Sequence, residues 1–119
     1  MKPENLLYDD RYLLKIADFG FATSLAGKDG SGLLKTVLGT ESYMAPEIHQ
    51  HEKYSGTAVD IFAAGIILFI MYTGHPPFVK ADPKSDAYYK CLCNNKHVAF
   101  WNAHSKNKPG KNEFFSQEL

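Results

Sequence analysis

The chain has 119 residues, 45% of them hydrophobic, which is typical of a single globular domain. Thirteen basic and 13 acidic residues give a formal net charge of zero, so charge points to neither a nucleic acid nor an anionic membrane as partner. No signal peptide is visible, and the apolar run at 61–72, interrupted by Gly65, is shorter than the ~20 residues of a membrane span. We therefore expect a soluble, cytoplasmic protein that binds neither nucleic acid nor membrane.

A β-hairpin is the first predicted element. Residues 6–8 and 12–17 are short runs rich in Leu, Ile and Tyr, and Asp9, Asp10 and Arg11 separate them, a pattern typical of two strands joined by a turn. Residues 23–32 follow with three glycines and no hydrophobic period. They are predicted to form an exposed loop.

A short helix is predicted to begin at Pro46 and Glu47, because proline suits the first helical position and an acid in the first turn favours the helix dipole. It should end before Ser55. The next predicted helix covers 58–73, with Thr57 as its N-cap and Asp60 three residues further on. This helix is apolar on nearly every face and so should be buried within a larger protein.

The C-terminal third begins at Gly74, which should end that helix, and the two prolines that follow prevent its continuation. A further helix is predicted from Asp82 or Ser85 through Leu92. Residues 104–112 have the composition of a linker before a last fragment at 113–119.

The cysteines, histidines and late aromatic residues give no sign of a site. Cys91 and Cys93 are one residue apart, poor geometry for pairing with each other, and are expected to be reduced thiols. The histidines lack metal-like spacing and are expected to be surface or packing residues, as are the late aromatic side chains. These residues are His49, His51, His75, His97, His104, Phe100, Trp101, Phe114 and Phe115.

Two short motifs contain residues that could bind a metal ion together. The run Lys-Pro-Glu-Asn at 2–5 lies across the predicted hairpin from Asp-Phe-Gly at 18–20, so Asn5 and Asp18 should meet at one end of the hairpin. Mg²⁺ prefers oxygen ligands, often one or two from protein, with phosphate and water completing the octahedron. Taken singly, Asn5 and Asp18 would more often be turn residues. Their joint pattern predicts a metal site, with Lys2 near a transferred phosphate.

These motifs, together with Gly-Thr-Glu-Ser-Tyr-Met-Ala-Pro-Glu at 39–47 and Asp-Ile-Phe-Ala-Ala-Gly at 60–65, resemble the C-terminal lobe of eukaryotic-type serine/threonine protein kinases, among them the calcium/calmodulin-dependent and energy-sensing groups. The resemblance implies a mainly helical fold with a small β-hairpin, the lower lobe of an α+β family fold whose N-lobe is absent. Residues 1–119 would form one partial kinase domain. Phe62 stands where the family usually has tryptophan.

The resemblance also implies roles for individual residues. Phosphoryl transfer from ATP and Mg²⁺ to serine or threonine hydroxyls of a protein substrate would use Lys2, Asn5, Asp18 and Thr40, with Asn5 and Asp18 on the metal. The regulatory phosphosite would be Thr36, modified by an upstream activating kinase, with Thr23, Ser24 and Ser31 as weaker candidates. The ATP site would include Lys2, Glu4, Asn5, Leu7 and Asp18, with Leu7 beneath the adenine.

The sequence departs from the family pattern at its start. The catalytic base is an aspartate expected immediately before Met1, and the Gly-rich loop, strand lysine and helix glutamate that complete ATP binding are also missing. We expect the isolated chain to be inactive. Two explanations stay open: an incomplete gene model that starts at an internal methionine, or a genuine kinase remnant that acts as a non-catalytic protein-interaction module.

Overall fold

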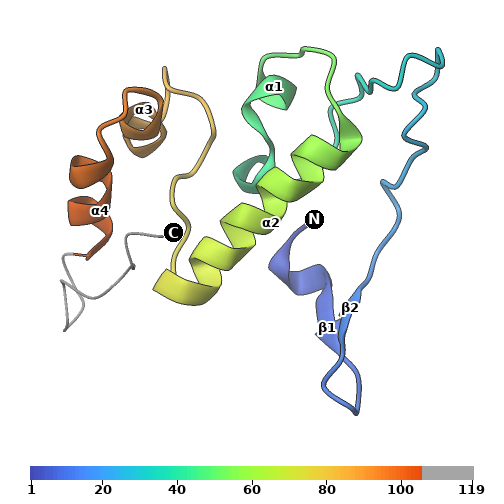
Figure 1. Ribbon diagram of the computed structural model, residues 1–119, viewed down its shortest axis with the longest axis horizontal. Helices are drawn as coiled ribbons and strands as arrows, with labels where there is room; N and C mark the ends of the chain where they lie inside the picture. Colours follow the sequence, from blue (N-terminus) through green and yellow to red (C-terminus); the bar gives the residue numbers. More distant parts are fainter. Residues whose placement is uncertain (106–119) are drawn as a thin grey trace.

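A computed structural model describes residues 1–105 and shows a mainly helical chain with one small sheet (Figure 1). The mainly helical fold with a β-hairpin was predicted and is confirmed. In chain order the elements are the 3-10 helix η1 (Pro3–Asn5), strands β1 (Leu6–Tyr8) and β2 (Leu14–Ile16), the 3-10 helix η2 (Glu41–Tyr43), and helices α1 (Pro46–His49), α2 (Gly56–Thr73), α3 (Ala87–Cys93) and α4 (His97–Ser105).

The hairpin is antiparallel, with Leu6 opposite Ile16 and Tyr8 opposite Leu14. Its second strand is shorter than the predicted 12–17. Tyr12 has a positive φ of 59°, a turn conformation that is incompatible with an extended strand, so β2 begins only at Leu14. The loop predicted at 23–32 is confirmed, because these residues form no helix or strand and nearly all are exposed.

The long helix α2 begins two residues earlier than predicted. Its N-cap is Ser55, whose hydroxyl accepts a hydrogen bond from the Ala58 amide at 3.5 Å, so Thr57 and Asp60 lie inside the helix and form no cap. At the other end Gly74 adopts a φ of 82° and donates its N–H to the carbonyl of Ile70. The predicted stop at Gly74 is confirmed.

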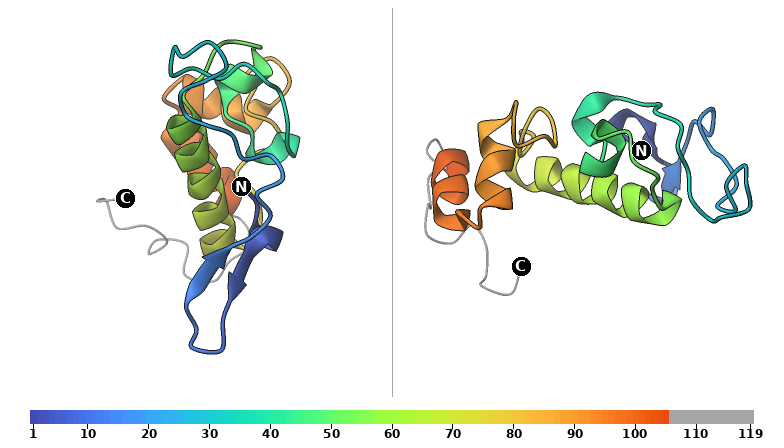
Figure 2. Two further views of the ribbon diagram at one scale, coloured as in Figure 1. Left: turned by 90° about the vertical axis from the view of Figure 1, so that its right-hand side faces the viewer. Right: turned by 90° about the horizontal axis from the view of Figure 1, so that it is seen from above.

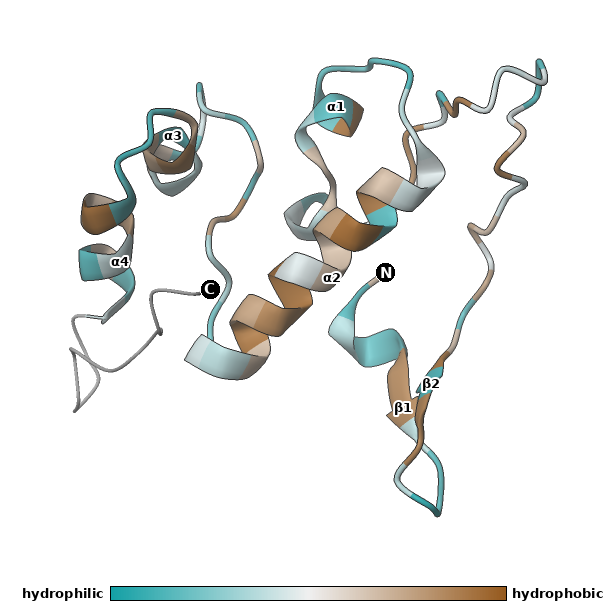
Figure 3. Ribbon diagram, in the orientation of Figure 1, coloured by the Kyte–Doolittle hydropathy of each residue, from teal (hydrophilic) through white to brown (hydrophobic). Residues whose placement is uncertain are grey.

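Helix α2 is apolar along most of its length, with Asp60 as its single charged residue (Figure 3). With 18 residues and a mean hydropathy of 1.8, it is long and apolar enough to cross a membrane by length and composition, which corrects the expectation that the apolar run is too short. This is weak evidence for a membrane span, because the core helix of a soluble protein meets the same criterion. Within the described residues Ile66 and Ile67 are buried, but Ile61 and Met71 are more than 70% exposed, so burial on all sides is not observed.

The core lies between α2, the segment that follows it, and α3. Ile66, Phe78 and Ala81 are buried together, and partly buried hydrophobic side chains pack around them: Tyr43, Phe62, Ile70, Tyr89 and Leu92. Helices α3 and α4 lie on one side of α2, and the hairpin projects from the other side (Figure 2). The radius of gyration is 16.2 Å, larger than the ~13 Å of a compact domain of this length.

Helix α3 starts later than predicted, with Asp86 as its N-cap instead of Asp82 or Ser85. One oxygen of the buried Asp86 carboxylate accepts from the amides of Tyr88 and Tyr89, both at 2.9 Å. The other accepts from the amides of Val79 at 2.8 Å and Lys80 at 3.3 Å. A single carboxylate thus joins α3 to the segment after α2.

Helix α4 was not predicted, and the linker expected from 104 begins inside it, since His104 and Ser105 are its last residues. The helix forms because its aromatic face has a partner: Phe69 of α2 stacks on Trp101 at 5.7 Å between ring centroids. Phe100 is 2% exposed, and His104 contacts Phe69 and stacks on His75. The packing roles of these residues are confirmed, whereas Phe114, Phe115, the rest of the linker and the last fragment lie outside the described residues.

We expect Asp86→Ala to lower the free energy of unfolding by about 2–4 kcal/mol, because it removes a helix cap and leaves two further amides without their acceptor. Asp86→Asn should lose less, since its remaining oxygen can still cap α3. The measurement is urea unfolding followed by the fluorescence of Trp101, the single tryptophan. Asp82→Ala, which removes a half-buried turn carboxylate that accepts from Lys84 and Ser85, is the control; an equal loss in both alanine variants would contradict this account.

Candidate functional site

The hairpin brings Asn5 and Asp18 together, as its pattern predicts. Asn5 directly precedes β1, and Asp18 lies two residues after β2, so both stand at the open end of the ladder. The carbonyl of Asn5 accepts a hydrogen bond from the Ala17 amide at 2.8 Å. The Asn5 side-chain amide donates to the Asp18 carboxylate across 3.5 Å. The carboxamide of the half-buried Asn5 and the carboxylate of the exposed Asp18 therefore lie side by side.

Asp18 has the backbone of a turn residue. Its φ is 61°, in the left-handed region, and its second carboxylate oxygen accepts from the Gly20 amide at 3.1 Å. A Cβ on Gly20 would lie only 3.1 Å from that same oxygen, so glycine permits the close approach. Phe19 between them is largely exposed. The turn thus leaves the carboxylate exposed, and within residues 1–105 it forms no ion pair.

Of the other residues of the predicted ATP site, Lys2 contacts this pair through the backbone, because its carbonyl accepts from the Asn5 amide at 3.1 Å. Lys2 is the N-cap of η1 and is half-buried. Leu7 is exposed on β1 opposite Lys15. Glu4 lies near η2: burial raises the pKa of Tyr43, and the negative charge of Glu4 raises it further.

Thr40 and Thr36 lie in the segment that leads into η2. Thr40 is the N-cap of η2, where its carbonyl accepts from the Tyr43 amide at 3.1 Å. Thr36 is exposed, and its carbonyl accepts from the hydroxyl of Tyr54 at 2.6 Å. Over residues 1–105 the side chains of Lys2 and Thr40 make no hydrogen bond to Asn5 or Asp18, and no group of three or more His, Cys, Asp or Glu residues could hold a metal ion.

A hollow of about 410 Å³ lies beside the same segment, and sequence reasoning missed it. Burial, and to a smaller extent the charge of Lys80, lowers the pKa of His49 in its wall. Lys80 forms an ion pair with Glu41 at 3.4 Å, a contact between residues 39 positions apart that no local pattern could reveal. The lining residues are Val37, Leu38, Gly39, Glu41, Met44, Ile48, His49, His51 and Lys80.

Comparison with known proteins decides the family. Residues 1–119 match the family model described as the protein kinase domain. The chain belongs to the protein kinase family. Two parts of this chain therefore belong to a kinase domain. One is the open end of the hairpin, with Asn5 and Asp18, and the other is the segment from Thr36 to Thr40.

Relatives of the kinase chain include a protein that is named as a serine/threonine kinase. It is 48% identical over 101 residues to CBL-interacting protein kinase 24 of Oryza sativa subsp. japonica, which covers 85% of the chain and 22% of that protein. It is 45% identical over 78 residues to CBL-interacting serine/threonine-protein kinase 10 of Arabidopsis thaliana, covering 66% of the chain and 16% of the relative. The chain thus spans about a fifth of the length of these curated relatives.

Asp9 closes the hairpin that carries the site. One oxygen of its carboxylate accepts from the amides of Arg11 at 3.0 Å and Leu13 at 2.8 Å, and the other lies 3.4 Å from the ammonium of Lys15. These contacts, the Leu13 amide foremost, hold the pKa of Asp9 below its ordinary value of 3.8. The sequence predicts Asp9 in the turn, but its role in closing the turn is visible only in these contacts.

We expect the turn to weaken in acid. Because the pKa of Asp9 is lowered in the folded state, its stabilising contribution is present above 3.8 and is lost as the pH falls through the lowered pKa. The amide resonances of Arg11 and Leu13 should move together in an NMR titration, with a midpoint below 3.8. Asp10→Ala should leave that titration in place and Asp9→Ala should remove it; a midpoint at or above 3.8 would argue against the turn bonds.

Proposed function

We propose that this chain is the C-terminal lobe of an ATP-dependent protein serine/threonine kinase in which Asn5 and Asp18 bind Mg²⁺. The observation that carries the proposal is the contact between these two side chains at the open end of the hairpin. Held by Asn5 and Asp18, the ion would supply positive charge beside the phosphates of ATP. We place the protein in the cytoplasm.

The residues present fit such an ion. Asp18 supplies a carboxylate oxygen, and the Asn5 amide, turned about its last torsion, supplies a carbonyl oxygen at nearly the same place. Both side chains belong to residues that are at least partly open to solvent, so phosphate and water can complete the octahedron. Lys2, which lies three residues before Asn5 in the chain, is proposed to steady the transferred phosphate. Catalysis would then come from positioning and charge neutralisation.

The protein substrate is proposed to bind along residues 39–47, next to the hollow lined by Val37 and Leu38. Thr40, at the start of η2, is proposed to order the catalytic groups, and Glu4 and Leu7 to contribute to the nucleotide site. A base outside residues 1–119 would accept the proton of the substrate hydroxyl. Phosphorylation of the exposed Thr36 by an upstream kinase would add about two negative charges to this segment.

Regulation by a further protein is a second part of the proposal. The relatives named above are described as CBL-interacting, and the chain shares 42% identity over 96 residues with another of them, CBL-interacting protein kinase 9 of Oryza sativa subsp. japonica. We propose that the native protein has a regulatory partner of the same kind. The aligned region covers 21% of that relative, so binding should be tested with the native protein.

A non-catalytic interaction module is the competing proposal, and the exposed apolar side chains favour it. Large hydrophobic residues of the hairpin, of the turn after it and of α2 are open to solvent within the described residues, and such surfaces often mark protein contacts. They include Leu7, Leu14, Ile16, Phe19, Ile61, Leu68 and Met71. This alternative predicts a soluble, folded chain that binds protein but no nucleotide.

Sequencing the full transcript upstream of Met1 separates the two proposals. An in-frame His-Arg-Asp preceded by a Gly-rich loop is expected for the enzyme. A stop codon, with mature transcripts that begin at Met1, would overturn the enzymatic proposal and leave the interaction module.

Asp18→Asn in the native protein should lower kcat/KM for a peptide substrate by at least about 100-fold, because a neutral amide replaces the charged metal ligand. Raising the Mg²⁺ concentration should recover part of the loss, since the metal site is weakened and not removed. Asp10→Asn, on the same hairpin but at its closed end, is the matched control and should keep full activity. Activity of the Asp18 variant equal to the control would refute the metal site.

A further inference from the structure

Residues 25–36 contact a second segment, 53–56, that lies just before and at the start of α2. The two segments form an isolated antiparallel bridge between Leu34 and Tyr54. The Leu34 amide donates to the Tyr54 carbonyl at 2.8 Å, and the Tyr54 amide donates back to the Leu34 carbonyl at 2.9 Å. This reciprocal pair fixes the backbone of Leu34 at one place on the surface.

The side chain of Tyr54 adds a third bond two residues further along. Its hydroxyl donates to the carbonyl of Thr36 at 2.6 Å, and it is half-buried. The phenol, whose ordinary pKa of 10.0 is raised further by burial, is protonated and therefore a donor at physiological pH. Tyr54 thus holds Leu34 with its backbone and Thr36 with its side chain, so the intervening Lys35 is fixed from both sides.

Apolar contact accompanies these bonds. A Cβ on Gly56 would lie 2.8 Å from the Cδ2 of Leu25 and 3.1 Å from the Cδ1 of Leu34. The absence of a side chain at Gly56 therefore lets both leucines approach the first turn of α2. This close packing explains why an otherwise exposed loop stays against the helix.

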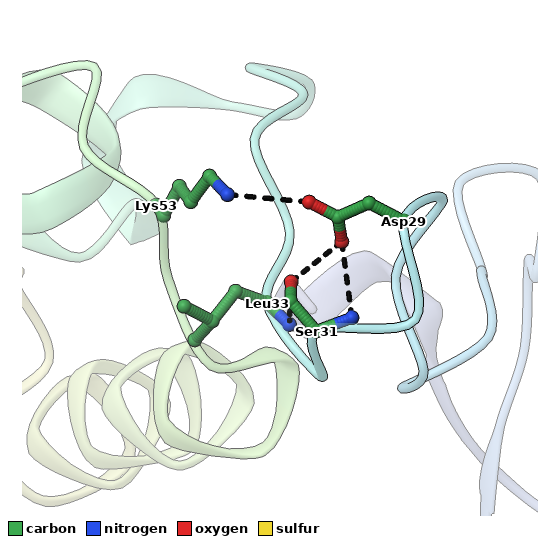
Figure 4. A network of polar contacts seen from close by, with 4 residues as sticks. All are labelled: Asp29, Ser31, Leu33 and Lys53. Carbon is green, nitrogen blue, oxygen red and sulfur yellow. Dashed lines mark hydrogen bonds and ion pairs between the residues drawn. The ribbon is translucent and has the colours of Figure 1, made fainter.

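An ion pair on the outer side contributes less. Lys53 donates to the carboxylate of Asp29 at 3.2 Å, and Asp29 also accepts from the amide and hydroxyl of Ser31 (Figure 4). The bonds from Ser31, followed by that from Lys53, hold the pKa of Asp29 well below its ordinary value. Both partners of the ion pair are more than half exposed, and exposed pairs stabilise little. The hydrogen bonds of Tyr54 therefore hold the loop more firmly than the ion pair between Lys53 and Asp29.

We propose that Tyr54 is a positioning residue for the phosphoryl-transfer reaction: it fixes the segment from Leu34 to Thr40 and thereby the wall of the substrate hollow. The three residues that follow Thr36, which are Val37, Leu38 and Gly39, line that hollow. Holding the Thr36 carbonyl therefore limits how far this wall can move. The inference rests on the proposed kinase function for its catalytic consequence, but the docking itself stands on the contacts above.

The test compares Tyr54→Phe with Tyr12→Phe in the native protein. Tyr54→Phe deletes one hydroxyl and keeps the ring, whereas the ring of Tyr12 is 85% exposed. Losing one hydrogen bond corresponds to about a fivefold effect. We expect Tyr54→Phe to raise the KM for a peptide substrate about fivefold, with kcat and the KM for ATP unchanged, and to speed tryptic cleavage after Lys35 by a similar factor. Lys53→Met should change both by about twofold or less.

Each outcome decides the proposal. Faster cleavage after Lys35 together with a higher peptide KM in Tyr54→Phe alone supports it. Unchanged cleavage, a lower kcat at constant peptide KM, or the same change in Tyr12→Phe would overturn it. If neither the wild type nor any variant transfers phosphate, the proposed function fails. The rate of cleavage after Lys35 then still shows whether Tyr54 holds the segment.

Discussion

The apolar surface of α2 is the constraint on which the rest of the structure depends. An 18-residue helix with apolar side chains on most faces is unstable in water unless other segments cover it. The chain supplies part of that cover from both directions: η2 packs from the N-terminal side, and Phe78, α3 and α4 pack from the C-terminal side. Asp86 secures this C-terminal cover, because its carboxylate holds the segment after α2 and the start of α3 at once.

The candidate site follows a different principle, since it depends on a hairpin that has almost no core. The ladder of β1 and β2 sets the separation of Asn5 and Asp18, and the Asp9 turn closes its other end. Most side chains of both strands are exposed over the described residues. The geometry of the pair is therefore defined by backbone hydrogen bonds and turn chemistry, which are local in the sequence.

This difference explains what the sequence could and could not reveal. The hairpin, the stop at Gly74 and the meeting of Asn5 with Asp18 follow from short-range patterns, and all three are present. The N-caps were misplaced because Thr57 and Ser55, or Ser85 and Asp86, are equally suitable by residue type, and only their contacts choose between them. Helix α4 has little periodicity of its own and depends on Phe69 from another element. Long-range contacts such as those of Tyr54 leave no local signal.

The two functional segments also differ in how firmly they are held. Residues 34–36 are fixed by a reciprocal backbone pair, a short bond from a half-buried tyrosine and close packing on Gly56. Asn5 and Asp18 share one contact of 3.5 Å in an exposed position, which contributes little in water. A cation placed between them would draw both oxygens inward, and any ligand that binds only the folded form stabilises it. On the proposed assignment, the substrate side of this kinase chain would be organised in advance, whereas the metal side would gain its order when an ion binds.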